Sequence, residues 1–206
     1  LSMLRYLHGD ALHRHPKLAR AMFRDRADQF RNRLGWEVRV NDAGEEWDEY
    51  DHATTLYVIW QTPGGGHGGS MRFLPTTGPI MVNDHFPALT GGRPLCDPTV
   101  WECTRFCLAP AAGPRVAAAL MLGGGELMTG FGVAQFAGVF DARMERIYRA
   151  IGATPRILGS EGEGRNRISL GLWSFTEDAR LRVARRAGLS PVMARHWFRR
   201  AFGRAA

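Results

Sequence analysis

Charged side chains occur in the first half of the chain at positions where the sequence pattern predicts burial. Arg26 stands in a helical stretch whose positions 18, 22, 30 and 34 are all apolar. Four-residue spacing places these side chains and Arg26 roughly on one face of the helix. An arginine that faces inward needs hydrogen-bonding partners, so Arg26 is a candidate site residue rather than an ordinary surface charge.

Glu102 and Arg105 are a second pair of chemically useful side chains, in a predicted strand at 100–108. Residues of a regular strand alternate between its two faces, so these two would point in opposite directions. If both serve one site, a β-bulge near Cys103 and Thr104 is required. Burial would raise the pKa of Glu102 and a neighbouring arginine would lower it. The carboxylate can therefore be a base or the partner in a structural ion pair.

The hydrophobic pattern places these residues in an alternation of helices and strands. Pro16 can open a helix to residue 34, and Gly35 is typical of a helix end. Further helices are predicted at 114–131, 141–151, 176–187 and 191–202, and strands at 3–8, 56–61, 70–74, 100–108, 132–140 and 167–175. Adjacent strands followed by alternation predict an α/β fold with a mixed sheet and helices on both faces.

Composition limits the class of protein. The 206 residues are 45% hydrophobic and 23% charged, which is typical of a globular protein, here one domain over 1–206. Three cysteines argue against a disulfide framework. Without a long apolar segment or a secretory signal, a cytoplasmic protein without membrane insertion is expected. The net charge of +7 favours an acidic partner but does not choose among nucleic acid, lipid and an acidic carrier protein.

Four motifs follow one another between residues 26 and 107. They are the set Arg26, Phe30 and Trp36; the tetrapeptide Asp48-Glu-Tyr-Asp51; the run GSMRFLPTTGP at 69–79; and WECTRF at 101–106. Together they resemble the motifs of the LuxI-type N-acyl-homoserine-lactone synthases, or autoinducer synthases. Each motif alone is weak evidence, whereas four in order are specific. The segment 140–148 resembles the family's next strand-to-helix junction, and the remainder is only compatible.

The resemblance implies a fold similar to the GNAT N-acetyltransferases, an αβα sandwich with a twisted mixed sheet. In that fold two neighbouring parallel strands splay apart and hold the acyl-pantetheine arm; here they would be 100–108 and 132–140. The implied enzyme is an acyltransferase that makes N-acyl-L-homoserine lactone, a quorum-sensing signal. The amine of S-adenosyl-L-methionine attacks an acyl thioester, and its carboxylate then closes the lactone and releases methylthioadenosine. S-adenosylmethionine is a substrate, and no cofactor is expected.

The resemblance also implies roles for individual residues. The catalytic group would be Glu102, Arg72, Asp48 and Arg105, and the S-adenosylmethionine site Arg26, Phe30, Trp36, Asp48, Asp51 and Arg105. Glu102 is the leading candidate for the base, directly or through water, with Arg72 and Arg105 as expected neighbours. An Asp48–Arg72 or Asp51–Arg26 network would frame the pocket. Aromatic faces would meet the adenine or the sulfonium, and a bulge could aim a backbone N–H at the thioester oxygen.

The acyl pocket should be apolar. Its candidate lining residues, each of which also fits a plain core role, are Met81, Phe106, Met121, Phe136 and Gly138. Some family members carry threonine in the strand at 132–140, which is associated with 3-oxo acyl chains. Ala137 or Gly138 stands there in this chain, and neither has a hydroxyl, so an unsubstituted chain is favoured.

The acyl donor could be acyl carrier protein or acyl-CoA. A carrier protein has an acidic recognition helix, which a basic enzyme attracts, and most of the family uses the carrier. It is therefore the favoured partner, although coenzyme A phosphates would also favour arginines. Candidate contacts are Arg115, Arg143, Arg146, Arg149 and Arg156.

Two other readings fit less of the sequence. A GNAT acyltransferase for another amine would share the fold, but the glycine-rich loop it needs for pyrophosphate is poor at 111–115. A nucleic-acid-binding module would use the basic helix-glycine-helix at 176–202, but charge alone is weak evidence and no nucleic-acid partner is expected. The histidines at 8, 13 and 15 follow no common metal-ligand spacing, so no metal is expected either.

Overall fold

A computed structural model describes residues 1–203 of the chain. Seven strands form one sheet in the order β1-β2-β3-β4-β5-β7-β6. The strands are β1 (Met3–His8), β2 (Leu56–Gln61), β3 (His67–Pro75), β4 (Val100–Leu108), β5 (Gln135–Asp141), β6 (Arg156–Glu161) and β7 (Ile168–Ser174). Strands β4 and β5 are parallel, and the other neighbouring pairs are antiparallel. The predicted mixed sheet is confirmed.

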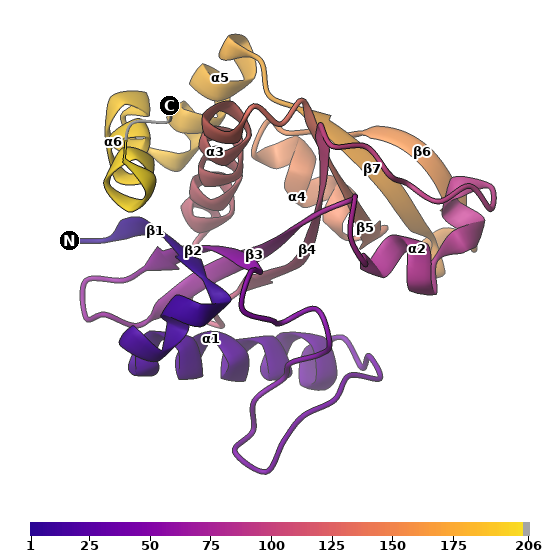
Figure 1. Cartoon of the computed structure of the whole chain (residues 1–206), viewed down its shortest axis with the longest axis horizontal. Helices are drawn as coiled ribbons and strands as arrows, with labels where there is room; N and C mark the ends of the chain where they lie inside the picture. Colours follow the sequence, from indigo (N-terminus) through magenta and orange to yellow (C-terminus); the bar gives the residue numbers. More distant parts are fainter. Residues whose placement is uncertain (204–206) are drawn as a thin grey trace.

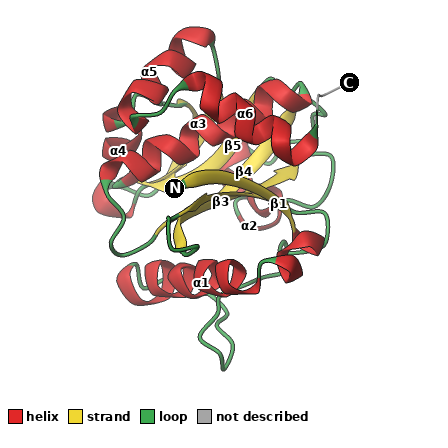
Figure 2. Ribbon diagram, turned by 90° about the vertical axis from the view of Figure 1, so that its left-hand side faces the viewer, coloured by secondary structure: helices red, strands yellow, loops and turns green. Residues whose placement is uncertain are grey.

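Helices cover both faces of this sheet. They are α1 (Pro16–Ala27), α2 (Met81–His85), α3 (Pro114–Phe131), α4 (Met144–Ala150), α5 (Glu177–Ala187) and α6 (Pro191–Phe202), with short helical turns at Gly9–Arg14, Asp28–Arg33, Pro87–Thr90 and Gly164–Asn166. Figure 1 shows α1 on one side of the sheet and α3, α5 and α6 on the other, and Figure 2 shows the same layers from the side. The arrangement is the predicted αβα sandwich. No helix among residues 1–203 is long and apolar enough to cross a membrane.

The first helix follows its prediction, with one change of geometry. It begins at Pro16 and, after Ala27, continues as a π-helical turn over Asp28–Arg33. Gly35 ends it with a φ of 67°, a conformation that glycine adopts without steric cost. The expected inward direction of Arg26 is confirmed, since this side chain is 1% exposed.

Helix α3 forms over the predicted 114–131 although it contains Gly123, Gly124 and Gly125. Glycine is unfavourable inside a helix by about 1 kcal/mol relative to alanine, so packing must compensate. A β-carbon on Gly125 would lie 2.1 Å from the ring of Phe175, and one on Gly123 would lie 2.8 Å from Val58 of β2. The glycines therefore allow α3 to lie close to the sheet and to the chain after β7.

The C-terminal arginines are not all on a solvated face. Glu126 of α3 is fully buried and accepts hydrogen bonds from Arg180 of α5, at 2.6 Å, and from Arg195 of α6. Arg180 also donates to the Pro191 carbonyl oxygen at 2.9 Å. These contacts join three helices on one side of the sheet.

Apolar clusters lie on both faces of the sheet. The largest packs the β1–β5 side chains Leu4, Val58, Met71, Phe73 and Phe136 against α3. On the opposite face one cluster, including Met22 and Tyr57, lies under α1, and another, including Ile80 and Leu172, lies near α2. The charged residues of the site are on this second face, where α1 and the loop before β2 meet strands β3 and β4.

Two irregularities of β4 shape the site. Strand β4 pairs with β5 only from Val100 to Glu102, although both strands continue, so the predicted splaying of this parallel pair is confirmed. Against β3, Arg72 is opposite Thr104 and Ser70 is opposite Cys107. Two residues of β4, at 105 and 106, therefore face one residue of β3, which is the two-against-one geometry of a β-bulge. The bulge lies just after the Cys103–Thr104 position at which it was expected.

Two elements were not predicted from the sequence. Strand β6 and helix α2 lie in stretches that the prediction left as loop. Boundaries also shift: β5 begins at Gln135 rather than 132, and α4 begins at Met144 rather than 141. Asp141 still serves as a cap, because its carboxylate accepts from the backbone N–H of Arg143 at 2.9 Å.

Candidate active site

Arg26 is the centre of the first part of a buried ionic network. It reaches the network from the last turn of α1, where the four-residue apolar spacing turns it toward the sheet. Its guanidinium makes two parallel 2.8 Å bonds to the carboxylate of Asp51 and donates at 2.6 Å to Glu46. Both partners belong to the loop between α1 and β2, and Glu46 is fully buried. Arg26 therefore has the partners that its burial requires.

Arg72 forms the second part of the network from the middle of β3. It is fully buried and donates to Asp48 at 2.5 and 3.2 Å. It also lies 3.1 Å from Asp51 and donates from Nε to the Thr104 hydroxyl at 2.8 Å. Both expected pairings, Asp48–Arg72 and Asp51–Arg26, are present, and they are linked through Asp51.

Arg105 completes the network from the bulge of β4. Its φ is 52°, a left-handed conformation that costs a non-glycine residue about 1–3 kcal/mol and marks a constrained position. The bulge brings its guanidinium to Glu46 at 3.0 Å and to Asp48 at 2.9 Å. Glu46 thus bridges Arg105 and Arg26. Without the bulge, strict alternation would direct Arg105 to the other face of the sheet.

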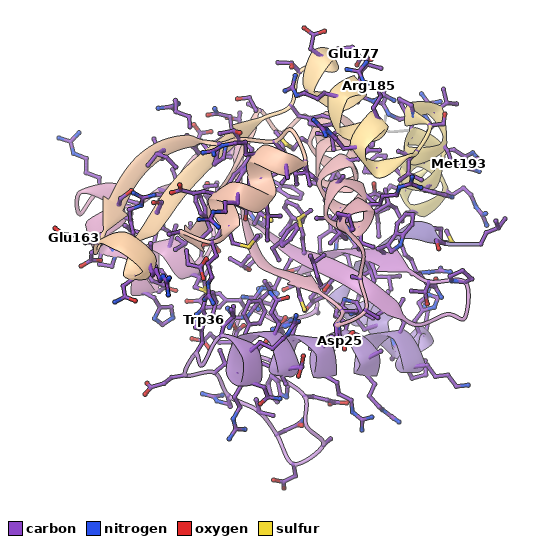
Figure 3. The ribbon with its side chains drawn as sticks, turned by 180° about the vertical axis from the view of Figure 1, so that it is seen from behind. Asp25, Trp36, Glu163, Glu177, Arg185 and Met193 are labelled. Atoms are coloured by element: carbon purple, nitrogen blue, oxygen red, sulfur yellow. The ribbon has the colours of Figure 1, made fainter. Side chains whose placement is uncertain are left out.

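Aromatic side chains border the three arginines. Phe30 and Trp36 stack with ring centroids 5.0 Å apart, and the Arg105 guanidinium lies 5.3 Å from the centre of the Phe30 ring. Trp36 keeps 39% of its surface exposed, whereas Phe30 is buried. Figure 3 shows Trp36 on the α1 side of the sheet, away from Glu177, Arg185 and Met193. A planar or cationic ligand can therefore reach Trp36 more easily than Phe30.

The charges of the network compensate one another. Burial disfavours ionisation of Asp51, but Arg26 and Arg72 outweigh burial and hold the pKa of this carboxyl well below its usual range. Burial raises the pKa of Tyr57, and the adjacent Asp51, which accepts the tyrosine's hydrogen bond at 2.6 Å, raises it further. The network thus has three guanidinium cations facing three carboxylates, and Tyr57 keeps its proton.

Glu102 is buried beside this network but is not part of it. The carboxylate accepts hydrogen bonds from the backbone N–H groups of Met81, at 3.0 Å, and Val82, at 2.7 Å. Burial raises the pKa of Glu102, and these two bonds and the charge of Arg72 offset only part of the shift. Of the two neighbours expected for Glu102, Arg72 is close enough to influence its pKa, whereas the bulge directs the Arg105 guanidinium to Glu46 and Asp48.

A cavity lies on the α3 side of the sheet, where β4 and β5 separate. Its apolar and aromatic lining comes from Met71, Phe106, Met121, Phe136, Gly138, Val139, Tyr148 and Trp173, with Cys103, Thr104 and Arg105 on the β4 side. A β-carbon on Gly138 would lie 2.9 Å from the Cys103 carbonyl oxygen. Glycine at this position therefore allows the β5 backbone to approach β4 closely. Arg105 belongs to both the cavity wall and the ionic network. The splayed strands therefore form a cavity, lined by many apolar and aromatic residues, that meets the polar site at Arg105 and Thr104.

A further polar chain joins α1 to β3. His67 contacts Asp25 at 2.6 Å through Nδ1 and Ser70 at 2.9 Å through Nε2. The residue types are those of a serine-hydrolase triad, but Ser70 is 2% exposed, so its hydroxyl is not available to a substrate. The chain fixes the helix that carries Arg26 against the strand that carries Arg72.

Comparison with known proteins decides the family. Residues 10–183 match the family described as autoinducer synthase. The chain belongs to the autoinducer synthase family. An acyl-homoserine-lactone synthase of Rhizobium etli is 40% identical over 183 residues, which are 85% of this chain and 86% of the relative. A second, of Pseudomonas aeruginosa, is 31% identical over 66% of this chain and 68% of its own. The protein is thus an enzyme of the acyl-homoserine-lactone synthase class.

Solved structures agree with this autoinducer synthase fold. The CoA-dependent acyl-homoserine lactone synthase MesI superposes with a TM-score of 0.79 at 27% identity, covering 91% of this chain and 96% of its own. A putative N-acetyltransferase from Lactobacillus plantarum superposes with a TM-score of 0.56 at 14% identity, covering 84% and 99%. The second likeness concerns the fold alone and agrees with the predicted GNAT architecture.

The synthase brings together most of the residues that were predicted for its site. The six predicted for S-adenosylmethionine, namely Arg26, Phe30, Trp36, Asp48, Asp51 and Arg105, lie in one connected group with Arg72. Of the predicted acyl-pocket residues, Phe106, Met121, Phe136 and Gly138 line the cavity. Met81 does not: its Sδ accepts from Arg105 at 3.6 Å on the polar side. Met81 is held there because the Glu102 carboxylate caps the first turn of α2.

Glu46, Thr104 and Tyr148 were missed as site residues. Glu46 lies two residues before Asp48. In an extended segment, side chains two residues apart point to the same side, so this spacing could have indicated that Glu46 points inward as Asp48 does. Thr104 lies two residues after Glu102 in a strand, so the same-face rule could have found it. The position of Tyr148 on the cavity follows from the docking of α4, which no short-range pattern gives.

Proposed function

We propose that this synthase makes N-acyl-L-homoserine lactone from S-adenosyl-L-methionine and an acyl thioester. The amine of S-adenosylmethionine attacks the thioester carbonyl and expels the thiol, which forms an amide. The carboxylate of the same molecule then attacks its own γ-carbon, closing the lactone and expelling methylthioadenosine. The sulfonium is already a good leaving group, so the protein has to orient the reactants and accept a proton.

The observation that carries this proposal is the dual position of Arg105. Its guanidinium is bound to Glu46 and Asp48 in the ionic network, and the same residue lines the apolar cavity between β4 and β5. A reaction between a polar amino-acid derivative and an acyl thioester needs two unlike compartments that meet at the bond to be formed. This chain has that combination at the bulge of β4.

The ionic network suits S-adenosylmethionine because that molecule carries charges of both signs. Its ammonium and sulfonium would be attracted to Glu46, Asp48 and Asp51, and its carboxylate to an arginine. Arg105 is the least buried of the three arginines, since its side chain is 9% exposed against 1% and 0% for the other two. We assign the substrate carboxylate to Arg105 and the aromatic contact with adenine or sulfonium to the exposed Trp36.

Glu102 is the proposed base for the acylation step. The attacking amine must lose a proton, and a buried carboxylate that has no guanidinium partner can accept one, directly or through water. The raised pKa of Glu102 supports this role, because it brings the carboxylate closer to the pH at which the enzyme works. Its bonds to the α2 backbone hold the group in one orientation. A bulge N–H as donor to the thioester oxygen stays a prediction.

Acyl carrier protein is the proposed donor. The net charge of +7 and the exposed arginines of α4 and the residue before it, Arg143, Arg146 and Arg149, support attraction of an acidic carrier helix. Coenzyme A phosphates would meet the same side chains. MesI is described as CoA-dependent, as is BjaI, which is 24% identical with a TM-score of 0.79 over 92% of this chain and 90% of its own. The test must therefore include both donors.

The deciding experiment is a mass-spectrometric assay of the purified protein with S-adenosylmethionine and paired acyl-carrier and acyl-CoA thioesters. Equal amounts of methylthioadenosine and acyl-homoserine lactone are expected, with a higher kcat/KM for carrier-bound chains. If coenzyme A thioesters are used better, the donor assignment is wrong and the lactone chemistry stands. If another amine is acylated and no lactone forms with any thioester, the proposed function is wrong.

A further inference from the structure

Helix α2 lies between the ionic network and the base proposed for the acylation step. It is only five residues long, from Met81 to His85. The backbone N–H groups of Met81 and Val82, in its first turn, hold the Glu102 carboxylate at 3.0 and 2.7 Å. The orientation of Glu102 therefore depends on where α2 is placed, and the contacts that anchor this helix also act on the base.

Tyr50 connects α2 to the loop of the ionic network. The tyrosine is 4% exposed, and its hydroxyl donates at 2.6 Å to the carboxylate of Asp84, near the end of α2. Its backbone N–H donates at 2.9 Å to Asp48, and the Arg72 guanidinium lies 5.6 Å from the centre of its ring. Tyr50 thus contacts two members of the network with its backbone and ring, and it contacts α2 with its hydroxyl.

The hydrogen bond from Tyr50 to Asp84 has one direction. Burial raises the pKa of Tyr50, and the bond to Asp84 and the charge of that carboxylate raise it further, so the phenol keeps its proton and is the donor. The Tyr50 carbonyl oxygen accepts from the buried hydroxyl of Thr55. Because both the backbone and the side chain of Tyr50 are anchored, the loop that carries Asp48 is fixed to the helix that holds Glu102.

We infer that Tyr50 and Asp84 are a pair of positioning residues, which hold α2 so that Glu102 faces the amine of the S-adenosylmethionine bound by the ionic network. The inference rests on the proposed function, since it concerns the base of that reaction. In the tetrapeptide Asp48-Glu-Tyr-Asp51, the proposed function uses only the two aspartates. The tyrosine between them adds the contact that fixes the base relative to the substrate, and correct placement of a reacting group is a large part of catalysis.

A second contact between the same loop and the same helix provides a control. Glu49 lies 3.8 Å from His85, and their side chains are 62% and 52% exposed. Exposed pairs of this kind contribute little to stability. Glu49→Gln therefore changes a carboxylate next to Tyr50 without removing an anchor of α2.

The charged groups around Glu102 predict a pH effect. Burial raises the pKa of Glu102, the two α2 bonds and Arg72 of β3 lower it, and Asp84 of α2 raises it again. Burial also raises the pKa of the nearby Tyr50 and Cys103, so both stay neutral. Loss of the Asp84 charge should therefore move the acidic limb of activity to lower pH, whereas Tyr50→Phe keeps that charge and should leave the limb in place.

The test measures lactone formation by mass spectrometry. Tyr50→Phe and Asp84→Ala should each lose about tenfold in kcat, and the double variant should lose no more than either alone, because both changes remove the same bond. Asp84→Asn should stay within about threefold of the wild type, because its amide oxygen still accepts from Tyr50. The KM for S-adenosylmethionine should change by less than about twofold in these variants. Glu49→Gln should leave kcat and the acidic limb unchanged.

A second measurement shows whether the pair acts through Glu102. Added to Glu102→Gln, Tyr50→Phe should cost less than about twofold in kcat, because no base is left to position. The inference is wrong, while the synthase function stands, if the Tyr50 and Asp84 variants keep the wild-type kcat, raise only the KM, or cost as much in the Glu102→Gln background. An acidic limb that does not move in Asp84→Asn would also contradict it. Absence of any lactone from the wild type would instead overturn the proposed function.

Discussion

At the scale of single residues, Glu102 has the most specific chemical expectation. Its pKa is raised by burial, and the base must be ionised to accept a proton. Activity should therefore fall as the pH is lowered through a value above the usual glutamate pKa of about 4.3. Glu102→Gln should lose about 100-fold or more in kcat and should no longer show this acidic limb. Methylthioadenosine release measured between pH 5 and pH 9 checks both.

The control for this variant is Glu145→Gln. Glu145 is a partly exposed glutamate that pairs with Arg167 at the surface, and its loss should change the pH profile little. Circular dichroism should find both variants folded, since the amide oxygen that Glu102→Gln leaves in place can still accept one backbone N–H of α2. A Glu102→Gln enzyme that keeps its activity and its acidic limb would exclude Glu102 as the base.

Glu46 has a different expectation, because it holds two arginines. Glu46→Gln removes the charge that faces both Arg26 and Arg105, and loss of one partner from a buried ion pair costs about 3–5 kcal/mol. We expect the free energy of unfolding in urea to fall by about 3 kcal/mol and the KM for S-adenosylmethionine to rise. Glu45→Gln is the matched control, because Glu45 lies next to it and its carboxylate contacts only exposed groups, Arg20 at 3.9 Å and the Asn41 amide at 3.3 Å. Equal effects of the two variants would contradict the bridging role of Glu46.

The same two residues show what sequence could and could not predict about the site. The apolar spacing around Arg26 was enough to predict that it is buried and needs partners. Glu45 and Glu46 are chemically identical neighbours, and which of them turns inward depends on how the loop before β2 folds back on α1. A backbone bond from Glu46 N–H to the Phe23 carbonyl oxygen, 3.0 Å long, fixes that loop. No local pattern contains this contact.

At the scale of elements, the packing of α3 depends on its glycines. A β-carbon on Gly130 would lie 2.1 Å from the ring of Phe198 in α6, which is 2% exposed and has no room to move freely. Gly130→Ala should therefore lower the free energy of unfolding by about 1–3 kcal/mol, although alanine favours an exposed helix by about 1 kcal/mol. Gly64, which has nothing within 4 Å of an added β-carbon, is the control and should change by less than about 0.5 kcal/mol. Chemical denaturation of both variants measures the difference. If Gly130→Ala is instead stabilising, the Phe198 ring can move aside to accommodate the methyl group.

The elements that sequence predicted well are those with strong local signals. Helix α1 begins at a proline, and α5 has Thr176 as a cap, whose hydroxyl accepts from Ala179 N–H. Strand β6 was missed because its residues are mostly exposed and have no alternating apolar pattern. It pairs with β7 along one side only. Helix α2 is five residues long and has no side-chain cap of its own; the Glu102 carboxylate satisfies its first N–H groups from a distant strand.

At the scale of the whole molecule, the sheet separates the ionic network from the cavity. The ionic network includes Arg26 of α1, and the cavity is lined by Met121 of α3 and Tyr148 of α4. Figures 1 and 2 show α1 and α3 on opposite sides of the sheet. The two sides of the sheet are connected at the gap between β4 and β5, which stop pairing after Glu102. Under the proposed function, this arrangement would let an acyl chain and S-adenosylmethionine approach from opposite faces and meet at the bulge.

The exposed arginines of α4 test the donor assignment at this scale. Arg146 and Arg149 flank Tyr148 on the same helix but point to solvent, so a carrier protein that docks on α4 would deliver its acyl chain to the cavity beneath. The double variant Arg146→Glu, Arg149→Glu should lower kcat/KM for carrier-bound thioesters about tenfold at low salt, and the deficit should shrink as salt screens the surface charges.

The pair Arg199→Glu, Arg200→Glu makes the same change in net charge on exposed positions of α6. If α4 is the docking helix, this second pair should have little effect, and the KM for S-adenosylmethionine should be unchanged in both. A loss of the same size in the two double variants would mean that only the overall charge attracts the carrier, and no loss in either would exclude α4 as its contact.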